Sequence, residues 1–215
     1  MCGRFVNINK IKDLVEQFNI GVDSVNELSI SKSYNISPTQ YSAVILKDTV
    51  HRKIEMMHWG LIPSWSKNMK FSSKMINARV ESIKEKTSFK NLVNTNRCIV
   101  VVSGYFEWAQ VEGQKQPYYI YNDKKNILPI AGLWSSWNDI HSFTIITKGS
   151  DTGLGLLHHR MPLILDDNSI DSYLNNNITF DKSYKALRTQ LNYHKVSTMV
   201  NSTINNNKTC IAPIE

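Results

Sequence analysis

Arg97-Cys98-Ile99-Val100-Val101-Val102 is a short apolar run made mostly of β-branched residues. Such residues favour extended backbone, and the run therefore predicts a buried strand. Cys98 is expected to act in it as a small hydrophobic residue of the core. The segment Gly104-Tyr105-Phe106-Glu107-Trp108 follows directly and places one carboxylate in an aromatic stretch.

Other short segments on both sides of this run have the same character. They are β-branched or aromatic and are bounded by turn residues, which is typical of strands. Strands are predicted at residues 42–46, 52–59, 117–121, 128–133, 143–147 and 162–165. Lys47-Asp48 fits a turn between the first two, and the polar residues 19–33 predict a loop.

Helical spacing of apolar residues is confined to three segments. Residues 11–18 predict a short amphipathic helix with Asn7 or Asn9 as its cap, and residues 169–174 and 181–191 predict two later helices. Strands dominate and the helices do not alternate with them, which favours an α+β fold with a mostly antiparallel, barrel-like sheet and peripheral helices. Since no linker divides the chain, a single domain over residues 1–215 is predicted.

The composition fits a globular protein with a sizeable core, since 41% of the 215 residues are hydrophobic and 20% are charged. The 25 Lys and Arg exceed the 18 Asp and Glu, and the net charge of +7 is compatible with a polyanion such as nucleic acid. No apolar run approaches the roughly 18 residues of a membrane span, and residues 1–9 lack the apolar stretch of a signal peptide. We therefore expect a cytoplasmic protein that does not bind membranes.

Cys2 follows Met1 directly. Cysteine is small enough for the initiator methionine to be removed, and the mature chain is then expected to begin with a thiol and an α-amine on adjacent carbons. Their reference pKa values, about 8.5 and about 7.7–8.0, leave both partly deprotonated near neutral pH. An aldehyde can form an imine with this amine, and the thiol can close a five-membered thiazolidine. The alternative is an inert residue in a frayed terminus.

The three cysteines are odd in number and widely spaced, which predicts neither a disulfide framework nor a zinc site. Polar clusters that interrupt apolar stretches are stronger candidates for chemistry. Glu107 lies in an apolar setting that should raise its pKa and suit it to proton transfer, although it could instead be a structural carboxylate paired with a buried Arg. His158 and His159 could be catalytic, or one core and one exposed histidine.

Three more residues in these clusters have two interpretations each. Asn77 could orient a reacting group or form a turn or cap, and Arg79 and Arg160 could bind substrate or form ordinary salt bridges. A nucleophile, a carboxylate, a histidine and an amide are what acyl transfer or aldehyde condensation requires. In the segment 59–65, Trp59 and Trp65 could pack in the core or stack on unpaired bases.

Six motifs in order resemble those of the SOS-response-associated peptidase family, the abasic-site processing proteins. They are Met1-Cys2-Gly3-Arg4-Phe5, Tyr34-Asn35-Ile36-Ser37-Pro38-Thr39-Gln40, Trp59-Gly60-Leu61-Ile62-Pro63-Ser64-Trp65, Ile76-Asn77-Ala78-Arg79-Val80-Glu81, Gly104-Tyr105-Phe106-Glu107-Trp108 and His158-His159-Arg160-Met161-Pro162. The resemblance implies one β-rich domain with a positively charged groove for single-stranded DNA. It also implies a thiazolidine crosslink between Cys2 and an abasic site, which shields the lesion.

The resemblance also implies roles for individual residues. Cys2 is the covalent nucleophile, Asn77 orients the terminus and the sugar, Glu107 shuttles protons, and His158 assists ring opening of the sugar. Arg4, Arg79 and Arg160 resemble phosphate contacts, a role that suits the guanidinium group. Trp65 is expected to stack on a base and Thr147 to hydrogen-bond the DNA backbone. Ser66-Lys67 replaces a second Trp of some members, which weakens the expected stacking wedge.

The expected partner is single-stranded DNA with abasic sites, bound by a monomer without metal or other cofactor, and the protein would join the nucleoid when bound to DNA. No motif identifies a protein partner at replication forks. The family name further implies self-processing or another peptidase activity. An imine between the α-amine and the sugar further implies a lyase-type reaction. Two rival functions stay open. The first is an N-terminal-nucleophile cysteine hydrolase (an amidase or peptidase) in which His158 activates Cys2, and the second is a non-covalent single-stranded DNA-binding module.

Overall fold

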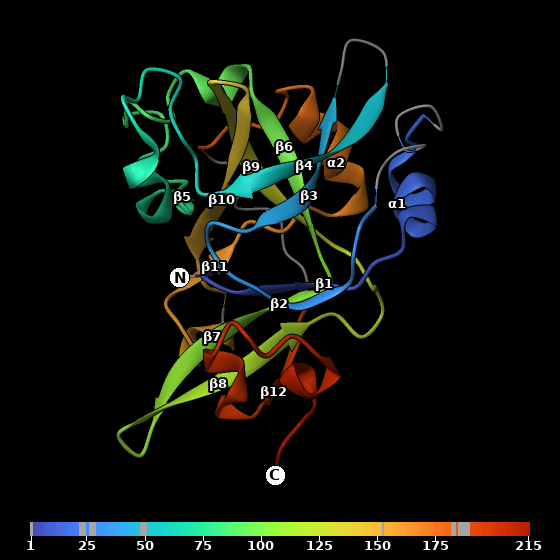
Figure 1. Cartoon of the computed structure of the whole chain (residues 1–215), viewed down its shortest axis with the longest axis vertical. Coiled ribbons are helices and arrows are strands. Elements are labelled where there is room, and N and C mark those ends of the chain that lie inside the picture. The colour runs from blue at the N-terminus through green and yellow to red at the C-terminus, as the bar shows by residue number, and fades with distance from the viewer. Residues whose placement is uncertain are drawn as a thin grey trace.

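The computed structural model describes residues 2–21, 25, 29–47, 51–151, 153–181, 184 and 190–215. Figure 1 shows two sheets, one above the other, with the N-terminal end of the chain at the level where they meet. Ser103 alone separates the last strand residue of the upper sheet, Val102, from the first one that follows in the lower sheet, Gly104. The apolar run 97–102 therefore leads from one sheet directly into the other.

The upper sheet is barrel-like and has the strand order β11-β10-β4-β3-β6-β9, with β5 beside β10. Because β9 also pairs with β10, the strands from β10 through β4, β3 and β6 to β9 form a closed ring. All pairs are antiparallel except those of β10 with β4 and with β5. The strands are β3 (Tyr41–Lys47), β4 (Arg52–Trp59), β5 (Asn77–Arg79), β6 (Arg97–Val102), β9 (Leu128–Trp137), β10 (Ile140–Gly149) and β11 (Arg160–Pro162).

The lower sheet is antiparallel throughout and has the order β12-β8-β7-β1-β2. Its strands are β1 (Phe5–Asn7), β2 (Ser33–Ile36), β7 (Gly104–Val111), β8 (Gln114–Tyr121) and β12 (Asn192–Lys195). The predicted β-rich α+β class with a mostly antiparallel, barrel-like core is confirmed. The strand β7 was not predicted, because Gly104 and Glu107 break the apolar character of its sequence.

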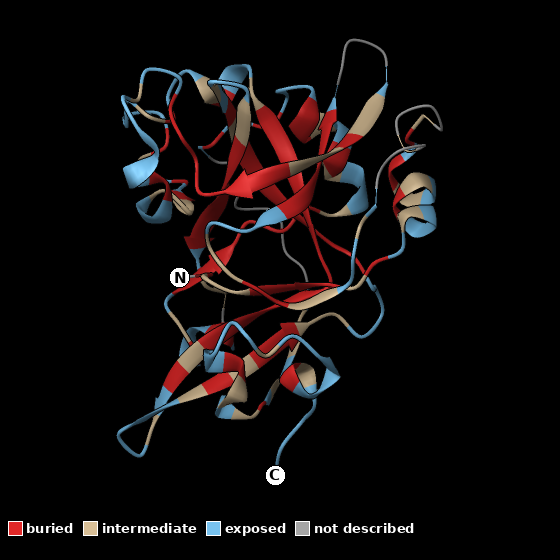
Figure 2. Ribbon diagram, in the orientation of Figure 1, coloured by how far each residue is buried: buried red, intermediate tan, exposed pale blue. Residues whose placement is uncertain are grey.

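The core explains the position of β6, in which every residue is buried. Alternate side chains of this strand enter two different hydrophobic clusters, with Ile99 and Val101 in one and Cys98, Val100 and Val102 in the other. Figure 2 shows the buried strands of the barrel, flanked by exposed helical segments. Cys98 is therefore a core residue, as predicted.

The helices lie at the periphery. They are α1 (Ile11–Phe18), α2 (Asp167–Leu174) and the 3-10 helices η2 (Met69–Lys74), η3 (Leu92–Asn94), η4 (Leu154–Leu156), η6 (Thr198–Asn201) and η7 (Lys208–Ile211). The prediction of an Asn cap for α1 is wrong. The N-cap is Lys10, without a side-chain hydrogen bond, and Asn7 instead accepts hydrogen bonds from Asn9. No helix within the described residues is long and apolar enough to span a membrane.

Two further predictions differ from the structure or fall outside it. The strand expected at 162–165 is β11, which ends at Pro162, and Ile164 adds only a single bridge to Ile130. Beyond Pro162 the chain passes from β10 towards β9, since the Leu163 N–H still donates to the Ile146 carbonyl at 2.8 Å and the Leu165 N–H donates to the Pro129 carbonyl at 2.8 Å. The helix expected at 181–191 lies mostly outside the described residues, as does the end of the turn after Lys47.

Candidate active site and nucleic-acid interface

Cys2 lies completely buried in a hydrophobic cluster that draws residues from both sheets. Phe5 and Tyr105 from the lower sheet and Trp59 from the upper one belong to it, and the Phe5 and Trp59 rings are 4.7 Å apart. Burial raises the pKa of the Cys2 thiol, and the nearby charge of Glu107 raises it further. The thiol is therefore uncharged at neutral pH.

Asn77 holds the backbone of Cys2. Parallel pairing of β5 with β10 sets Asn77 opposite Ile145, and its Nδ2 donates a hydrogen bond of 2.9 Å to the Cys2 carbonyl oxygen. Its Oδ1 is buried and has no hydrogen-bond partner among the described residues. Asn77 thus reaches across the fold rather than capping a turn, and it has one acceptor that a bound group could use.

Glu107 lies on β7, and its residue is 3% exposed. A backbone hydrogen bond of 2.9 Å from Phe106 to Arg4 keeps β7 beside the segment that carries Cys2. Burial raises the pKa of the Glu107 carboxyl to about 7. Both its acid and its carboxylate form are therefore populated near neutral pH, which is what a proton shuttle requires.

A cavity of about 560 Å³ brings Glu107 together with His158, and Trp108, Lys115 and Asn201 complete its lining. The backbone N–H of Arg160 donates a 2.9 Å hydrogen bond to His158 Nδ1. Burial lowers the pKa of His158, and the imidazole is therefore neutral at pH 7, with its proton assigned to Nε2. His159 is exposed and stacks on the His158 ring.

Lys115 and Asn201 were missed by sequence reasoning. They come from β8 and from η6, far from the recognised motifs, and Asn201 also accepts a hydrogen bond of 2.8 Å from the Trp108 indole. No local pattern marks either residue, because only the packing of the C-terminal segment against β7 and β8 brings them to this cavity.

Arg160 is buried and already has protein partners. Its guanidinium contacts the Glu81 carboxylate at 2.6 Å and the Thr147 carbonyl oxygen at 2.6 Å. Thr147 Oγ1 accepts a third bond from it at 3.2 Å, and Thr147 is completely buried. In this state Arg160 and Thr147 form a structural unit with Glu81, so a DNA phosphate would have to compete with that carboxylate.

The other two arginine candidates differ in exposure. Arg4 is half-buried, and its Nη1 donates to Asn35 Oδ1 at 2.7 Å and to the Val200 carbonyl at 2.9 Å, which ties the N-terminal segment to the C-terminal one. Arg79 is exposed at the end of β5, two residues beyond Asn77. Arg79 is thus the more accessible guanidinium for a phosphate beside the site.

Trp59 and Trp65 have opposite environments. Trp59 is fully buried, and its indole N–H donates to the Ile76 carbonyl at 3.1 Å. Trp65 is 65% exposed, and exposed Met69 and Phe71 follow it on η2. Core packing is therefore the role of Trp59, while Trp65 offers an aromatic face to solvent.

The segment 65–74 is held to the barrel by close backbone contact. Gly60 has a φ of +131°, and a Cβ on it would lie 2.5 Å from the Ser72 carbonyl oxygen. Only glycine fits this position, and the Met75 carbonyl further accepts a 3.1 Å bond from Leu61. Because Lys67, Lys70 and Lys74 are exposed on the same segment, aromatic and basic groups alternate along one anchored surface. We call residues 65–74 the aromatic–basic segment.

The site thus combines a buried cysteine next to the initiator methionine, an amide on its carbonyl, a carboxyl that titrates near neutrality and a neutral histidine. In the described residues no group of three or more His, Cys, Asp or Glu side chains could hold a metal ion.

The chain belongs to the family described as SOS response associated peptidase (SRAP), whose model it matches over residues 1–203. It is 35% identical to the abasic site processing protein YoqW of Bacillus subtilis, with 96% of each chain covered. It is 33% identical to the abasic site processing protein HMCES of Gallus gallus over 85% of this chain and 66% of that one. A crystal structure of a Bacteroides thetaiotaomicron protein has the same fold, with a TM-score of 0.87, 24% identity and full coverage of both chains.

Proposed function

We propose that this protein captures abasic sites in single-stranded DNA as a covalent thiazolidine on Cys2, after removal of Met1. The observation that carries the proposal is that Asn77 holds the Cys2 carbonyl, while Glu107, whose charge acts on the Cys2 thiol, shares a cavity with His158. Relatives that are named abasic site processing proteins and match nearly the whole chain support the substrate class. DNA-damage processing is therefore the function that the site supports best.

The chemistry consists of a condensation, which releases one water, and an intramolecular addition, which closes the ring. The Cys2 α-amine adds to the C1 aldehyde of the ring-opened sugar, and loss of water gives an imine. The thiol then adds to the imine carbon, which forms the C–S bond while the thiol proton goes to nitrogen. Because the buried thiol of Cys2 is neutral, it carries the proton that this last step needs.

Glu107 and His158 divide the proton transfers in this proposal. As an acid, Glu107 protonates the hydroxyl that leaves as water, and its pKa of about 7 keeps enough of the acid form at neutral pH. Neutral His158, with a proton on Nε2, can donate to the ring oxygen as the sugar opens. Asn77 fixes the Cys2 carbonyl, and its Oδ1 can accept a hydrogen bond from the α-amine.

DNA is held, in this proposal, by the exposed groups beside the site. Trp65 and Phe71 present aromatic surface on which unpaired bases can stack, and Arg79 with the lysines of the aromatic–basic segment attracts phosphates. Each phosphate neutralised on a single strand should contribute about −0.7 to the slope of log K against log salt. The net charge of +7 agrees with this kind of partner.

A cysteine hydrolase is the second candidate, because the family description contains the word peptidase. Amide hydrolysis by cysteine requires a thiolate, whereas burial raises the pKa of the Cys2 thiol. The raised thiol pKa therefore disfavours amide turnover, and the names of the relatives favour aldehyde capture.

Intact-mass spectrometry tests the proposed function. The Met-processed protein is mixed with a single-stranded oligonucleotide that carries one abasic site, alongside Cys2→Ala and a form that retains Met1. An adduct at the summed mass less one water, absent from both controls, is expected. Intact DNA without adduct would favour the hydrolase or a simple binder. Cleaved DNA without a stable adduct would mean that the amine acts as a lyase and the ring does not close.

A further inference from the structure

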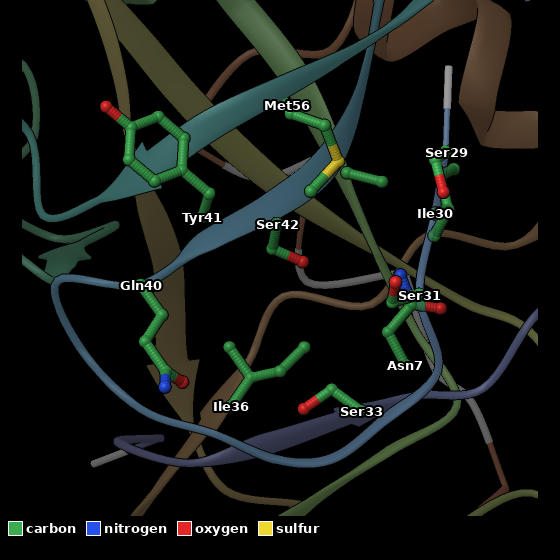
Figure 3. A pocket seen from close by; sticks show the side chains of 11 residues that line it. Asn7, Ser29, Ile30, Ser31, Ser33, Ile36, Gln40, Tyr41, Ser42 and Met56 are labelled. Atoms are coloured by element: carbon green, nitrogen blue, oxygen red, sulfur yellow. The ribbon is translucent and has the colours of Figure 1, made fainter.

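A second cavity, of about 450 Å³, lies between the upper and lower sheets, and Ile36 of β2, which lines it, also belongs to the hydrophobic cluster of Cys2. Its walls come from β3 and β4 above, from β1 and β2 below and from residues 29–31 at one side, as Figure 3 shows. The pairing of β3 with β6 covers Val44 and Ile45 and, among the described residues, does not extend to Tyr41–Ala43. Tyr41, Ser42 and Ala43, which lie outside this pairing, line the cavity.

Ser42 places a buried polar group at this cavity. Its residue is 2% exposed, and its hydroxyl oxygen has no hydrogen-bond partner within the described residues. In Figure 3 this hydroxyl points into the space bounded by Ile36, Ser33 and Asn7. A buried hydroxyl without a partner is unfavourable, and a ligand that hydrogen-bonds it would remove that penalty.

The lining restricts the chemistry of the ligand. Hydroxyl and amide groups of Asn7, Ser33, Ser42 and Gln40 alternate with the apolar side chains of Ile36 and Met56, and no lining residue carries a charge. An anion or a metal ion would find no counter-charge here. A flat neutral ring with polar edges and apolar faces fits, since its faces can contact Ile36 and Met56 while its edge reaches Ser42. Tyr41, 55% exposed at the rim, offers a further ring to such a ligand.

The cavity is close enough to Cys2 for both to engage one DNA strand. Three Cα–Cα steps lead from Cys2 to Phe5, which limits the distance between these two Cα atoms to about 11 Å. Phe5 pairs with Ile36, which adds about 5 Å. A lining residue of the cavity therefore lies within about 16 Å of the proposed nucleophile.

We propose that this cavity receives one nucleobase that flanks the abasic site on the same strand. The inference rests on the proposed function and adds to it a base-binding position away from Trp65. The base inserts its polar edge toward Ser42 and its faces between aliphatic side chains. Capture would then use one flanking base in addition to the phosphates.

Base omission tests this directly. Oligonucleotides carry an uncleavable tetrahydrofuran abasic analogue at the lesion position and a second one, in turn, at each flanking position, which removes a base but keeps every phosphate. Binding is measured by fluorescence anisotropy. Omission at one particular position is expected to weaken binding about tenfold, and omission elsewhere about twofold or less.

Two variants show whether the base at that flanking position binds in the cavity. Ser31 lines the cavity and is exposed, so Ser31→Trp should block it without disturbing the core. Asn94→Trp, at an exposed site on η3, is the size-matched control. The tenfold effect should disappear in Ser31→Trp, shrink to a few-fold in Ser42→Ala and persist in Asn94→Trp.

Equal effects in Ser31→Trp and Asn94→Trp would overturn the proposal, as would equal effects of omission at all positions. A separate crosslinking assay with a true abasic site distinguishes this failure from failure of the proposed function. If the protein crosslinks but base omission weakens binding equally at all positions, only the proposed base-binding role of the cavity is refuted. No crosslinking and no DNA binding refute both.

Discussion

The Cys2 site and the aromatic–basic segment 65–74 are built on opposite principles. Around Cys2 the titratable groups are buried or half-buried, and their pKa values move toward the neutral forms, with the pKa of Glu107 at about 7 and that of His158 lowered. On the segment 65–74, Trp65, Phe71 and the lysines are exposed and charged or aromatic. The covalent capture that we propose would use groups shielded from water, whereas the proposed DNA contact would use groups exposed to water.

If this division holds, changes at Cys2 and Glu107 should alter the reaction and leave DNA affinity intact. Changes at Trp65 and Arg79 should lower DNA affinity and leave the reaction intact.

The largest effect is expected for Cys2→Ala, which removes the thiol but keeps the α-amine. No stable adduct should form, while non-covalent affinity stays within about twofold of the parent. Crosslink yield on a denaturing gel, with anisotropy alongside, measures both; a stable adduct in the variant would end the thiazolidine proposal.

Glu107→Gln should slow crosslinking about 100-fold, the usual scale for loss of a general acid. Because the acid form donates, the contribution of Glu107 should fall as pH rises through about 7. The variant should lose that inflection from its pH–rate profile between pH 6 and 8. Glu107→Asp, which keeps a carboxyl, is the control and should retain the inflection; a profile of the same shape for Gln and Glu would exclude the proton-transfer role.

The same substitution has a second consequence, for stability. The pKa of Glu107 in the folded state lies above the unfolded value of about 4.3, so the folded protein binds the extra proton. The penalty for the buried charge is absent below about pH 4, grows as pH rises and is complete above pH 7. Relative to the parent, Glu107→Gln should gain roughly 3 kcal/mol in free energy of unfolding between pH 4 and 8. Urea denaturation at both pH values measures it, and an unchanged difference would place Glu107 in contact with water.

Trp65→Ala should weaken binding of single strands about tenfold, since loss of base stacking on one aromatic ring costs about 1–3 kcal/mol. Trp65→Phe should recover most of the affinity because a ring remains. The crosslinking rate at saturating DNA should not change. If the rate falls while affinity stays the same, Trp65 belongs with the reaction groups and the division between the two regions fails.

Arg79→Ala should have the smallest effect, a loss of a few-fold in affinity that is the same for all base sequences. One fewer phosphate contact should make the salt slope less steep by about 0.7. Arg79→Lys keeps the charge and should keep the slope. Titrations at several salt concentrations provide the measurement, and a loss that depends on base sequence would contradict a phosphate contact.

Much of the fold could be predicted from local patterns. The β-branched run 97–102 and the segments at 42–46, 52–59, 117–121, 128–133 and 143–147 are strands as expected, because side chains of this kind fit a pleated buried surface wherever they occur. The strand β7 and the N-cap of α1 were not predictable in this way. Glycine and glutamate disfavour strands locally, yet pairing with β1 and β8 imposes extended backbone on β7.

Six ordered motifs in the sequence determined the family and drew attention to Cys2, Asn77, Glu107 and His158. Tertiary structure alone decided how these residues meet, because Asn77 reaches Cys2 across 75 residues through a parallel strand pair. The tertiary structure also decided which side chains are exposed to solvent. Arg79 and Arg160 are the same residue type, but packing exposes one and buries the other against Glu81. Burial and long-range pairing depend on which surfaces pack together, and a local sequence pattern does not carry that information.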